Sequence, residues 1–185
     1  MKKILLAMIF ATTLNGCRSN WLTENLHHIP PTAYRSAQLD KEELEEIIQE
    51  YDIKTVLNLR GEHQGEQWYQ EEQQISRQYG IEYINVRLSA RRMPTRAELT
   101  ELITAIENSE PPIYFHCLYG SDRTGLASTV YSLLNGATLE QAIEQLDFYP
   151  YGHLPGEIDE FFEQYEQYVQ TTGKQDFKNW VLNAY

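Results

Sequence analysis

One short segment carries the residues best suited to chemistry, a cysteine and an arginine six positions apart. His116 to Gly125 reads His-Cys-Leu-Tyr-Gly-Ser-Asp-Arg-Thr-Gly, so that Cys117 and Arg123 frame a loop large enough for one phosphate group. Helix N-termini and neighbouring cations favour the thiolate form of a cysteine, which makes Cys117 a candidate nucleophile. The planar guanidinium of Arg123 offers two parallel donors to phosphate oxygens. These residue types at this spacing predict attack on a phosphate ester.

The flanking sequence predicts a strand before this loop and a helix after it. Pro112 to His116 is an apolar and aromatic run, as in a buried strand. Thr124 to Asn135 spaces its apolar residues for one helical face, and Gly136 suits a left-handed C-terminal stop. The free amides and the dipole at the start of such a helix bind anions. We therefore expect the substrate-binding cradle to comprise Leu118, Tyr119, Gly120, Ser121 and Thr124.

Individual residues of the loop suggest separate roles. We expect His116 to orient the loop through backbone contacts and Gly120 to let the backbone pass close to the ligand. Thr124 can donate its hydroxyl to the thiolate when the sulfur becomes the leaving group. Tyr119 can set the depth of the pocket or stack on an aromatic phosphoester. The alternative is an inert core thiol at Cys117, which the surrounding His, Gly, Asp, Arg and Thr residues argue against.

The loop resembles the Cys-x5-Arg-Ser/Thr signature, preceded by His, of the protein tyrosine phosphatase superfamily, which includes dual-specificity and phosphoinositide phosphatases. Its Asp-Arg pair resembles the pair found within this loop in bacterial dual-specificity-like phosphatases, and myotubularin-like lipid phosphatases share the Asp. Three further segments resemble the bacterial group: Tyr34 to Gln38, Val56 to Arg60 and Tyr151 to His153. The resemblance covers residues 32–170 and implies a metal-free phosphatase with a phosphocysteine intermediate. It implies phosphotyrosine or phosphoserine proteins or phosphoinositides as substrates.

The general acid of such a reaction has no obvious place in this sequence. Most of the superfamily carry an Asp on a separate upstream loop, but the corresponding segment here, Leu88 to Thr95, contains no carboxylate. We therefore hypothesise that Asp122 protonates the leaving oxygen. A carboxylate at a helix N-terminus can instead fix the loop or hold Arg123. His153 and Glu157 are the next candidates for the acid.

Arginines gather in that same upstream segment of an acidic chain. The formal net charge of −12 argues against nucleic acid as a partner and against general attraction to an anionic membrane surface. Arg91 and Arg92 instead predict contacts with a substrate that carries several phosphates, such as a phosphoinositide or an inositol phosphate. The alternatives are an acidic phosphotyrosine peptide as substrate, or ion pairs between these arginines and nearby surface Glu residues.

The N-terminus predicts export from the cytoplasm. A basic start precedes an apolar run, Ile4 to Leu14, that is too short to span a bilayer. Leu14-Asn15-Gly16-Cys17 resembles a bacterial lipoprotein signal-peptidase site, which implies a signal peptide over residues 1–16 and acylation of Cys17. We therefore expect an extracytoplasmic lipoprotein, periplasmic or on the cell surface, held at a membrane by its lipid anchor. Plain secretion is the alternative.

The two cysteines of the chain are thus the predicted acylation site and the predicted nucleophile, so we expect no disulfide. The histidines and acidic residues show no metal-ligand spacing, and we expect neither a metal nor another cofactor. A catalytically silent lipoprotein that binds phosphorylated ligands is the alternative to an enzyme. The intact Cys117 and Arg123 argue against that alternative.

Strands that alternate with helices predict a single α/β domain with a central, mostly parallel sheet flanked by helices. We expect strands at residues 54–59, 81–86 and 112–116, with the site at their carboxyl ends. Helical spacing appears at residues 66–79, 124–135, 139–147 and 157–170. Asp40 with Glu43, and Thr95 with Glu98, have the spacing of capping boxes, which predicts that a helix begins at each position.

The predicted domain boundaries follow from these elements. Residues 17–31 are expected to form the lipidated N-terminus and a linker, residues 32–170 the phosphatase domain, and residues 171–185 a C-terminal helical extension. We expect the aromatic segment Phe148 to Tyr151 to lie in the core, together with Phe161 and Phe162.

Overall fold

The computed structural model describes residues 25–185 of the chain. The predicted signal peptide over residues 1–16 and the predicted acylation site, Cys17, lie outside the described residues. Within the described range, no helix is both long enough and apolar enough to cross a membrane.

A five-stranded sheet forms the centre of the fold, in the order β1-β2-β5-β3-β4. The strands are β1 (His27–Ile29), β2 (Ala33–Ser36), β3 (Thr55–Asn58), β4 (Glu82–Asn85) and β5 (Ile113–His116). β1 pairs with β2 in antiparallel fashion, whereas all other neighbours are parallel. The predicted α/β fold with a mostly parallel sheet is confirmed, and β3, β4 and β5 lie within the three predicted segments.

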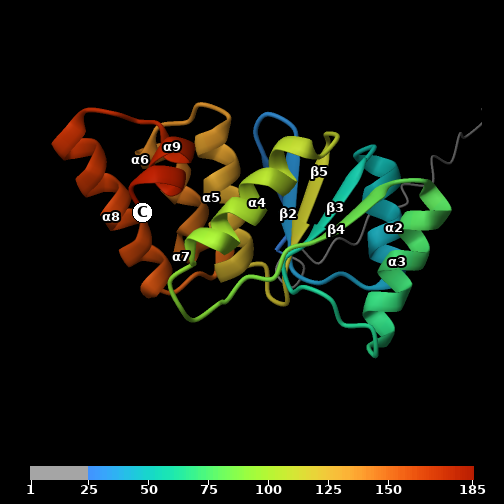
Figure 1. Cartoon of the computed structure of the whole chain (residues 1–185). Helices are drawn as coiled ribbons and strands as arrows, with labels where there is room; N and C mark the ends of the chain where they lie inside the picture. The colour runs from blue at the N-terminus through green and yellow to red at the C-terminus, as the bar shows by residue number, and fades with distance from the viewer. Residues whose placement is uncertain (1–24) are drawn as a thin grey trace, which may run out of the picture.

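Helices cover both faces of this sheet (Figure 1). α2 (Lys41–Glu50) and α3 (Gln67–Tyr79) lie on one face, and α4 (Arg96–Asn108) and α5 (Asp122–Leu134) lie on the other. The chain then continues through α6 (Leu139–Ile143), the 3-10 turn η1 (Glu144–Leu146), α7 (Phe148–Tyr151), α8 (Glu157–Thr172) and α9 (Phe177–Asn183). Both predicted capping boxes are present, at the starts of α2 and α4. Gly136 follows α5 with a φ of 86°, as predicted for a left-handed stop.

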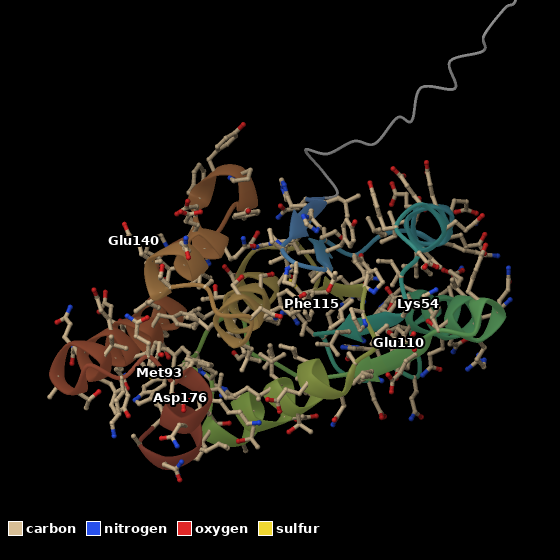
Figure 2. All side chains as sticks on the ribbon, turned by 90° about the horizontal axis from the view of Figure 1, so that it is seen from above. Lys54, Met93, Glu110, Phe115, Glu140 and Asp176 are labelled. Atoms are coloured by element: carbon tan, nitrogen blue, oxygen red, sulfur yellow. The ribbon has the colours of Figure 1, made fainter. Side chains whose placement is uncertain are left out.

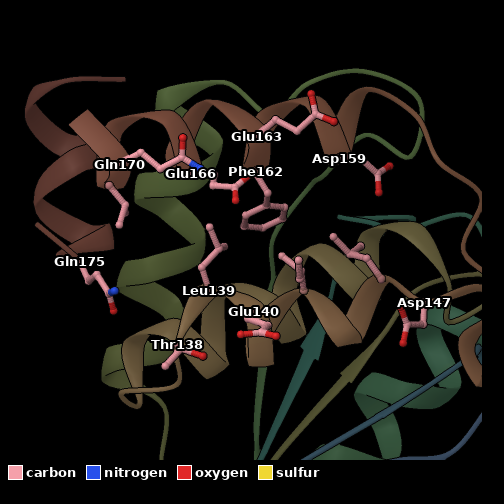
Figure 3. Close-up of a pocket in the computed structure, with 13 residues that line it drawn as sticks. Thr138, Leu139, Glu140, Asp147, Asp159, Phe162, Glu163, Glu166, Gln170 and Gln175 are labelled. Atoms are coloured by element: carbon pink, nitrogen blue, oxygen red, sulfur yellow. The ribbon is translucent and has the colours of Figure 1, made fainter. Parts of the chain in front are cut away.

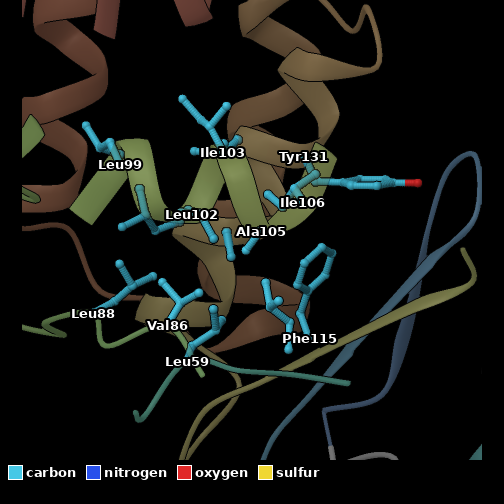
Figure 4. Close-up of a cluster of buried hydrophobic side chains, with 14 of the residues drawn as sticks. Leu59, Val86, Leu88, Leu99, Leu102, Ile103, Ala105, Ile106, Phe115 and Tyr131 are labelled. Carbon is cyan, nitrogen blue, oxygen red and sulfur yellow. The ribbon is translucent and has the colours of Figure 1, made fainter. Parts of the chain in front are cut away.

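Alternate residues of the strands face opposite helical layers, which divides the core in two. In β5, Tyr114 packs with the α2 and α3 side, whereas Phe115 packs with the α4 and α5 side. Figure 4 shows this second cluster, in which Leu102 and Ile106 of α4 lie near Phe115. Figure 2 shows Phe115 in the interior, with Glu140 at the periphery. Strand β5 is therefore packed on both faces and provides a rigid base for the loop that follows it.

The structure extends the domain beyond both predicted boundaries. β1 pairs with β2 and its Ile29 is fully buried, so the sheet begins inside the segment predicted to be a linker. At the other end, α9 buries Phe177 and Trp180 in the same core cluster as α4 and α8. Residues 171–185 thus complete the domain, whereas the sequence predicts an appended extension. Strands as short as β1 give too few residues for an apolar pattern to indicate them.

The aromatic residues of α7 differ from the prediction. Phe148 and Tyr149 are 69% and 76% exposed, because α7 is a single turn with non-helical backbone angles at Tyr149 and no buried residue. Phe161 and Phe162 of α8 are buried, as predicted.

Candidate active site

The predicted loop lies at the carboxyl edge of the sheet, at the end of its central strand. β5 ends at His116, residues 117–121 form the loop, and α5 begins at Asp122. β2 and β3 pair with the two sides of β5, where Ser36 and Asn58 are both opposite His116. The residues that follow β2 and β3 therefore flank the loop. Cys117 itself is only 3% exposed, so its sulfur lies within this surrounding structure.

Gly120 packs the loop against the end of β2. Its φ is 71°, and a Cβ atom at this position would lie 2.6 Å from the backbone nitrogen of Ala37. No side chain fits at that separation. The predicted close approach of Gly120 to a ligand stays a prediction, and within the protein the close approach is to the end of β2. The packing of the protein alone therefore requires glycine here.

Arg35, a fully buried residue of β2, binds the same loop directly. One terminal nitrogen donates to the Gly120 carbonyl at 2.7 Å. The other donates to the carbonyl of Gln145 at 2.7 Å and to its Oε1 at 3.0 Å. The guanidinium carbon lies 3.9 Å from the ring centroid of Tyr151. Burial lowers the pKa of Arg35 to about 10, so this side chain remains a cation at neutral pH.

A buried carboxylate lies beside His116, the residue before the candidate nucleophile. Oε2 of Glu72, from α3, is 3.4 Å from Nε2 of His116, and both side chains are almost fully buried. Gln38 and Tyr83 each donate a hydrogen bond to the Glu72 carboxylate. Burial favours the neutral carboxyl, but His116 and these two donors outweigh it and lower the pKa of Glu72. The imidazole of His116 thus lies beside the Glu72 carboxylate, although neither ring nitrogen has a hydrogen-bond partner within residues 25–185.

Arg123 lies in the first turn of α5, and one of its guanidinium nitrogens makes no hydrogen bond within the described residues. Its Nε atom is buried and has no hydrogen-bond partner within residues 25–185. A buried charged donor without an acceptor is unfavourable, and a bound anion removes that cost. The first amides of α5 add to the preference for an anion. The loop therefore has the chemistry of an anion site, with Cys117 at its start and Arg123 at its end.

Asp122 is hydrogen-bonded to His153, another of the candidate acids. Nδ1 of His153 lies 2.8 Å from Oδ1 of Asp122, and Nε2 lies 3.0 Å from Oδ2 of Asp159. The imidazole is 2% exposed, whereas the Asp122 and Asp159 side chains are 35% and 31% exposed. Burial opposes the imidazolium, but the bonds to the two carboxylates outweigh it and raise the pKa of His153. The charged imidazolium is therefore favoured beside Asp122.

The other predicted loop residues divide into a buried and an exposed group. Thr124 is fully buried, and its hydroxyl lies 3.5 Å from the carbonyl of Ser36. The start of α5 packs against β2, which brings this hydroxyl to Ser36. Ser121 is half-buried, while Leu118 and Tyr119 are 39% and 74% exposed. These two exposed side chains are available to a substrate that approaches the loop.

Arg91 and Arg92, predicted together as substrate contacts, have different surroundings. Arg91 lines an open groove of about 540 Å³ beside the loop, together with Tyr119 and Asp122. Arg92 donates two hydrogen bonds to the carboxylate of Glu98, at 2.8 and 2.5 Å. Arg92 thus forms an ion pair with a surface Glu, which the sequence left open as the alternative for both arginines. Arg91 remains the arginine of this pair that lies next to the loop.

Glu157 and Asp159, at the start of α8, have separate contacts. Glu157 lines the groove beside the loop and accepts a hydrogen bond from the backbone nitrogen of Met93 at 2.9 Å. Asp159 lines a second groove, of about 770 Å³, which contains Phe162 and several acidic side chains of α6 and α8 (Figure 3). Across residues 25–185, no group of three or more His, Cys, Asp or Glu residues is arranged to bind a metal ion.

A mostly parallel sheet whose central strand leads through a Cys-to-Arg loop into a helix is the arrangement of the protein tyrosine phosphatase class. Residues 18–161 match the family described as a DSP-PTPase phosphatase fused to NAD+ kinase. Because this match spans most of the chain, the protein belongs to that family of dual-specificity-type phosphatases. No curated protein matches the sequence.

Solved structures show the same fold at low sequence identity. Tk-PTP in its active form is 19% identical with a TM-score of 0.62, over 77% of this chain and 96% of that chain. PTPMT1 is 16% identical with a TM-score of 0.62, over 80% and 98% of the two chains. The core catalytic domain of the PP-IP phosphatase SIW14 from S. cerevisiae is 21% identical with a TM-score of 0.61, over 81% and 93%.

Proposed function

We propose that this chain hydrolyses phosphate monoesters through a phosphocysteine intermediate. The sulfur of Cys117 attacks phosphorus and displaces the alcohol or phenol oxygen, and water then breaks the S–P bond to release inorganic phosphate. Arg123 and the amides of the loop hold the phosphate oxygens in both steps. The observation that carries the proposal is the buried Nε of Arg123, which has no partner in the described part of the chain, on the loop that begins with Cys117.

For proton transfer we propose that Asp122 acts together with His153. In the first step, the His153 imidazolium passes its proton to Asp122 through the 2.8 Å hydrogen bond as Asp122 protonates the leaving oxygen, so that Asp122 ends the step as a carboxylate and His153 as a neutral imidazole. In the second step, Asp122 accepts a proton from the attacking water and passes it back to His153. The proton balance closes after each turnover, and no other acid is needed. The bond to Asp159 holds the imidazole in position for both transfers.

Phosphate release from an aryl phosphate tests the enzymatic proposal. The full chain, in mild detergent with a reductant and a chelator, is compared with Cys117→Ser and Arg123→Lys. We expect release by the wild type, background release by Cys117→Ser, and a large loss in Arg123→Lys, because lysine keeps the charge but lacks the planar fork. Wild-type activity in Cys117→Ser refutes the thiol mechanism. A reduced wild-type chain that is inactive on every phosphate ester is instead a module that binds phosphorylated ligands.

For the substrate we propose a phosphorylated protein, a phosphoinositide or an inositol phosphate. Two structural neighbours support a phosphorylated small molecule or lipid, since one structure is PTPMT1 in complex with PI(5)P and another is a PP-IP phosphatase, SIW14. The position of Arg91 in the groove beside the loop agrees with a substrate of more than one negative charge.

We also propose that acyl chains on Cys17 hold the protein at a membrane outside the cytoplasm. The N-terminal sequence is the support for this proposal. Expression of the full chain and of Cys17→Ser in bacteria grown with labelled palmitate provides the test. Label and membrane association are expected for the wild type and not for the variant. An unlabelled wild-type chain in the medium indicates secretion instead.

A further inference from the structure

Arg60 follows β3 at the edge of the loop, and the reaction proposed above gives it no role. Asn58 is opposite His116 in the sheet, and the amide of Leu59 donates to the His116 carbonyl at 2.9 Å. Because β3 and β5 are parallel and end side by side, Arg60 leaves the sheet at the same edge as the loop that follows His116.

The guanidinium of Arg60 extends from β3 toward the residues that follow β2. Gln38, on the far side of β5, donates its backbone amide to the Leu118 carbonyl at 3.4 Å. The Oε1 atom of Gln38 accepts a hydrogen bond from Arg60 at 2.9 Å. Trp68 of α3 stacks on the guanidinium, whose carbon lies 3.8 Å from a ring centroid. Arg60 is therefore held in a defined position where the loop leaves β5.

The charges around Arg60 favour an anionic ligand. Burial and the nearby Arg123 guanidinium lower the pKa of Arg60, while Glu72 and Cys117 oppose that change. Two guanidiniums at this proximity repel each other, and an anion that contacts both removes the repulsion. Within the described residues, Gln38 is the hydrogen-bond acceptor of this guanidinium, which has five N–H donors. The side chain is half-buried, so the other donors are available to a ligand.

We infer that Arg60 binds a second phosphoryl group of the substrate, next to the one that Cys117 attacks. The inference rests on the function proposed above and narrows its substrate class to bisphosphates, whether free in solution or on a lipid headgroup. Arg123 holds the reacting phosphoryl group, and the planar fork of Arg60 holds the second one. A monophosphate offers no acceptor to the donors of Arg60 that Gln38 does not engage, which is the physical basis of the preference.

Ligand binding without turnover tests this site independently of catalysis. Methylenebisphosphonate, which carries two phosphorus groups, and methylphosphonate, which carries one, are titrated into the full chain and into Arg60→Met. The loss of a charge-assisted contact should weaken bisphosphonate binding about tenfold to a hundredfold, and methylphosphonate binding much less. Arg60→Lys, with the charge but without the fork, should recover only part of the loss. Arg77→Met is the matched control, since this exposed arginine lies at the opposite end of α3 from Trp68.

Turnover then identifies the source of the bisphosphate. We compare an aryl phosphate, a soluble vicinal inositol bisphosphate and the same headgroup on a lipid in phosphatidylcholine vesicles. In Arg60→Met, KM should rise for at least one bisphosphate, and the loss of kcat/KM should exceed the loss for the aryl phosphate about tenfold or more. The substrate that shows this difference identifies the source, soluble or lipid.

Three outcomes separate this inference from the proposed function. Equal losses on all three substrates mean that Arg60 only supports the loop, and they overturn the inference. Unchanged binding of methylenebisphosphonate by Arg60→Met overturns it as well, even if the chain is an active phosphatase. Arg60-dependent binding by a chain without any phosphatase activity retains this site and refutes the catalytic proposal.

Discussion

Replacement of Arg35 by Met removes the cation that joins β2 to the candidate catalytic loop. The side chain donates three hydrogen bonds, at 2.7, 2.7 and 3.0 Å, one to Gly120 and two to Gln145. Each charge-assisted bond contributes about 1.5–3 kcal/mol. The variant also avoids the cost of burying a guanidinium that is 0% exposed. We therefore expect the free energy of unfolding to fall by about 2–4 kcal/mol and Tm to fall by roughly 5–15 °C.

The catalytic activity of Arg35→Met should also fall at temperatures where the variant is fully folded. The Gly120 carbonyl loses its donor, so the loop can shift, and a misplacement of about 1 Å can lower a rate about a hundredfold. Urea denaturation followed by circular dichroism measures stability, and aryl phosphate hydrolysis at a temperature where both proteins are folded measures kcat. Arg77→Met, the same change at an exposed position of α3, should alter neither quantity. A folded Arg35→Met chain with wild-type Tm and kcat refutes the anchoring role.

Three further substitutions test the charged groups around the loop. Because the native pKa of His153 lies above its ordinary value of 6.5, its bonds to Asp122 and Asp159 stabilise the fold fully below pH 6.5 and lose this effect as pH rises through the native value. His153→Gln should therefore lower Tm most at about pH 5–6 and least in alkaline buffer, and a pH-independent difference in Tm contradicts this. The pKa of Glu72 is lowered from 4.5, so its stabilisation is present above pH 4.5 and lost as pH falls further. Urea curves of Glu72→Gln should show a loss of about 1–3 kcal/mol at neutral pH that shrinks near pH 3; a constant loss shows that the carboxylate charge does not matter. Asp122→Asn should slow hydrolysis of a phosphoserine ester about a hundredfold, and of an aryl phosphate with a good leaving group much less. Equal rates in wild type and variant on the phosphoserine ester leave Asp122 with a structural role only.

Local sequence patterns are sufficient to predict the loop and the residues at which the helices begin. Cys117 and Arg123 belong to one strand–turn–helix unit, so their spacing alone brings them to the same loop. The capping boxes of α2 and α4 join residues three positions apart. Each of these features depends on a few neighbouring residues, which is the range over which a pattern is informative.

The contacts that support the loop join residues far apart in the chain. Arg35 and Gly120 are separated by 85 positions, and Asp122 and His153 by 31. A sequence pattern does not pair such positions, because their proximity is a consequence of sheet order. Gly120 illustrates the same limit, since its requirement for glycine comes from the end of β2.

Glu72 and Arg92 each have a sequence neighbourhood that indicates their surroundings. Glu72 lies three positions from both Tyr69 and Ile75, which places it on the buried face of α3, where a carboxylate needs a partner. Arg92 lies just before the α4 capping box, whose Glu98 is the carboxylate that it binds.

Detection of the phosphorylated enzyme is a direct test of the proposed phosphocysteine intermediate on Cys117. The full chain is mixed with a radiolabelled aryl phosphate, denatured in alkaline solution within the first turnover, and digested, and the labelled peptide is identified by mass spectrometry. We expect one labelled peptide that carries a phosphoryl group on Cys117, and none from Cys117→Ser. Release of phosphate by the wild type without label on Cys117, or with label on another residue, contradicts this expectation.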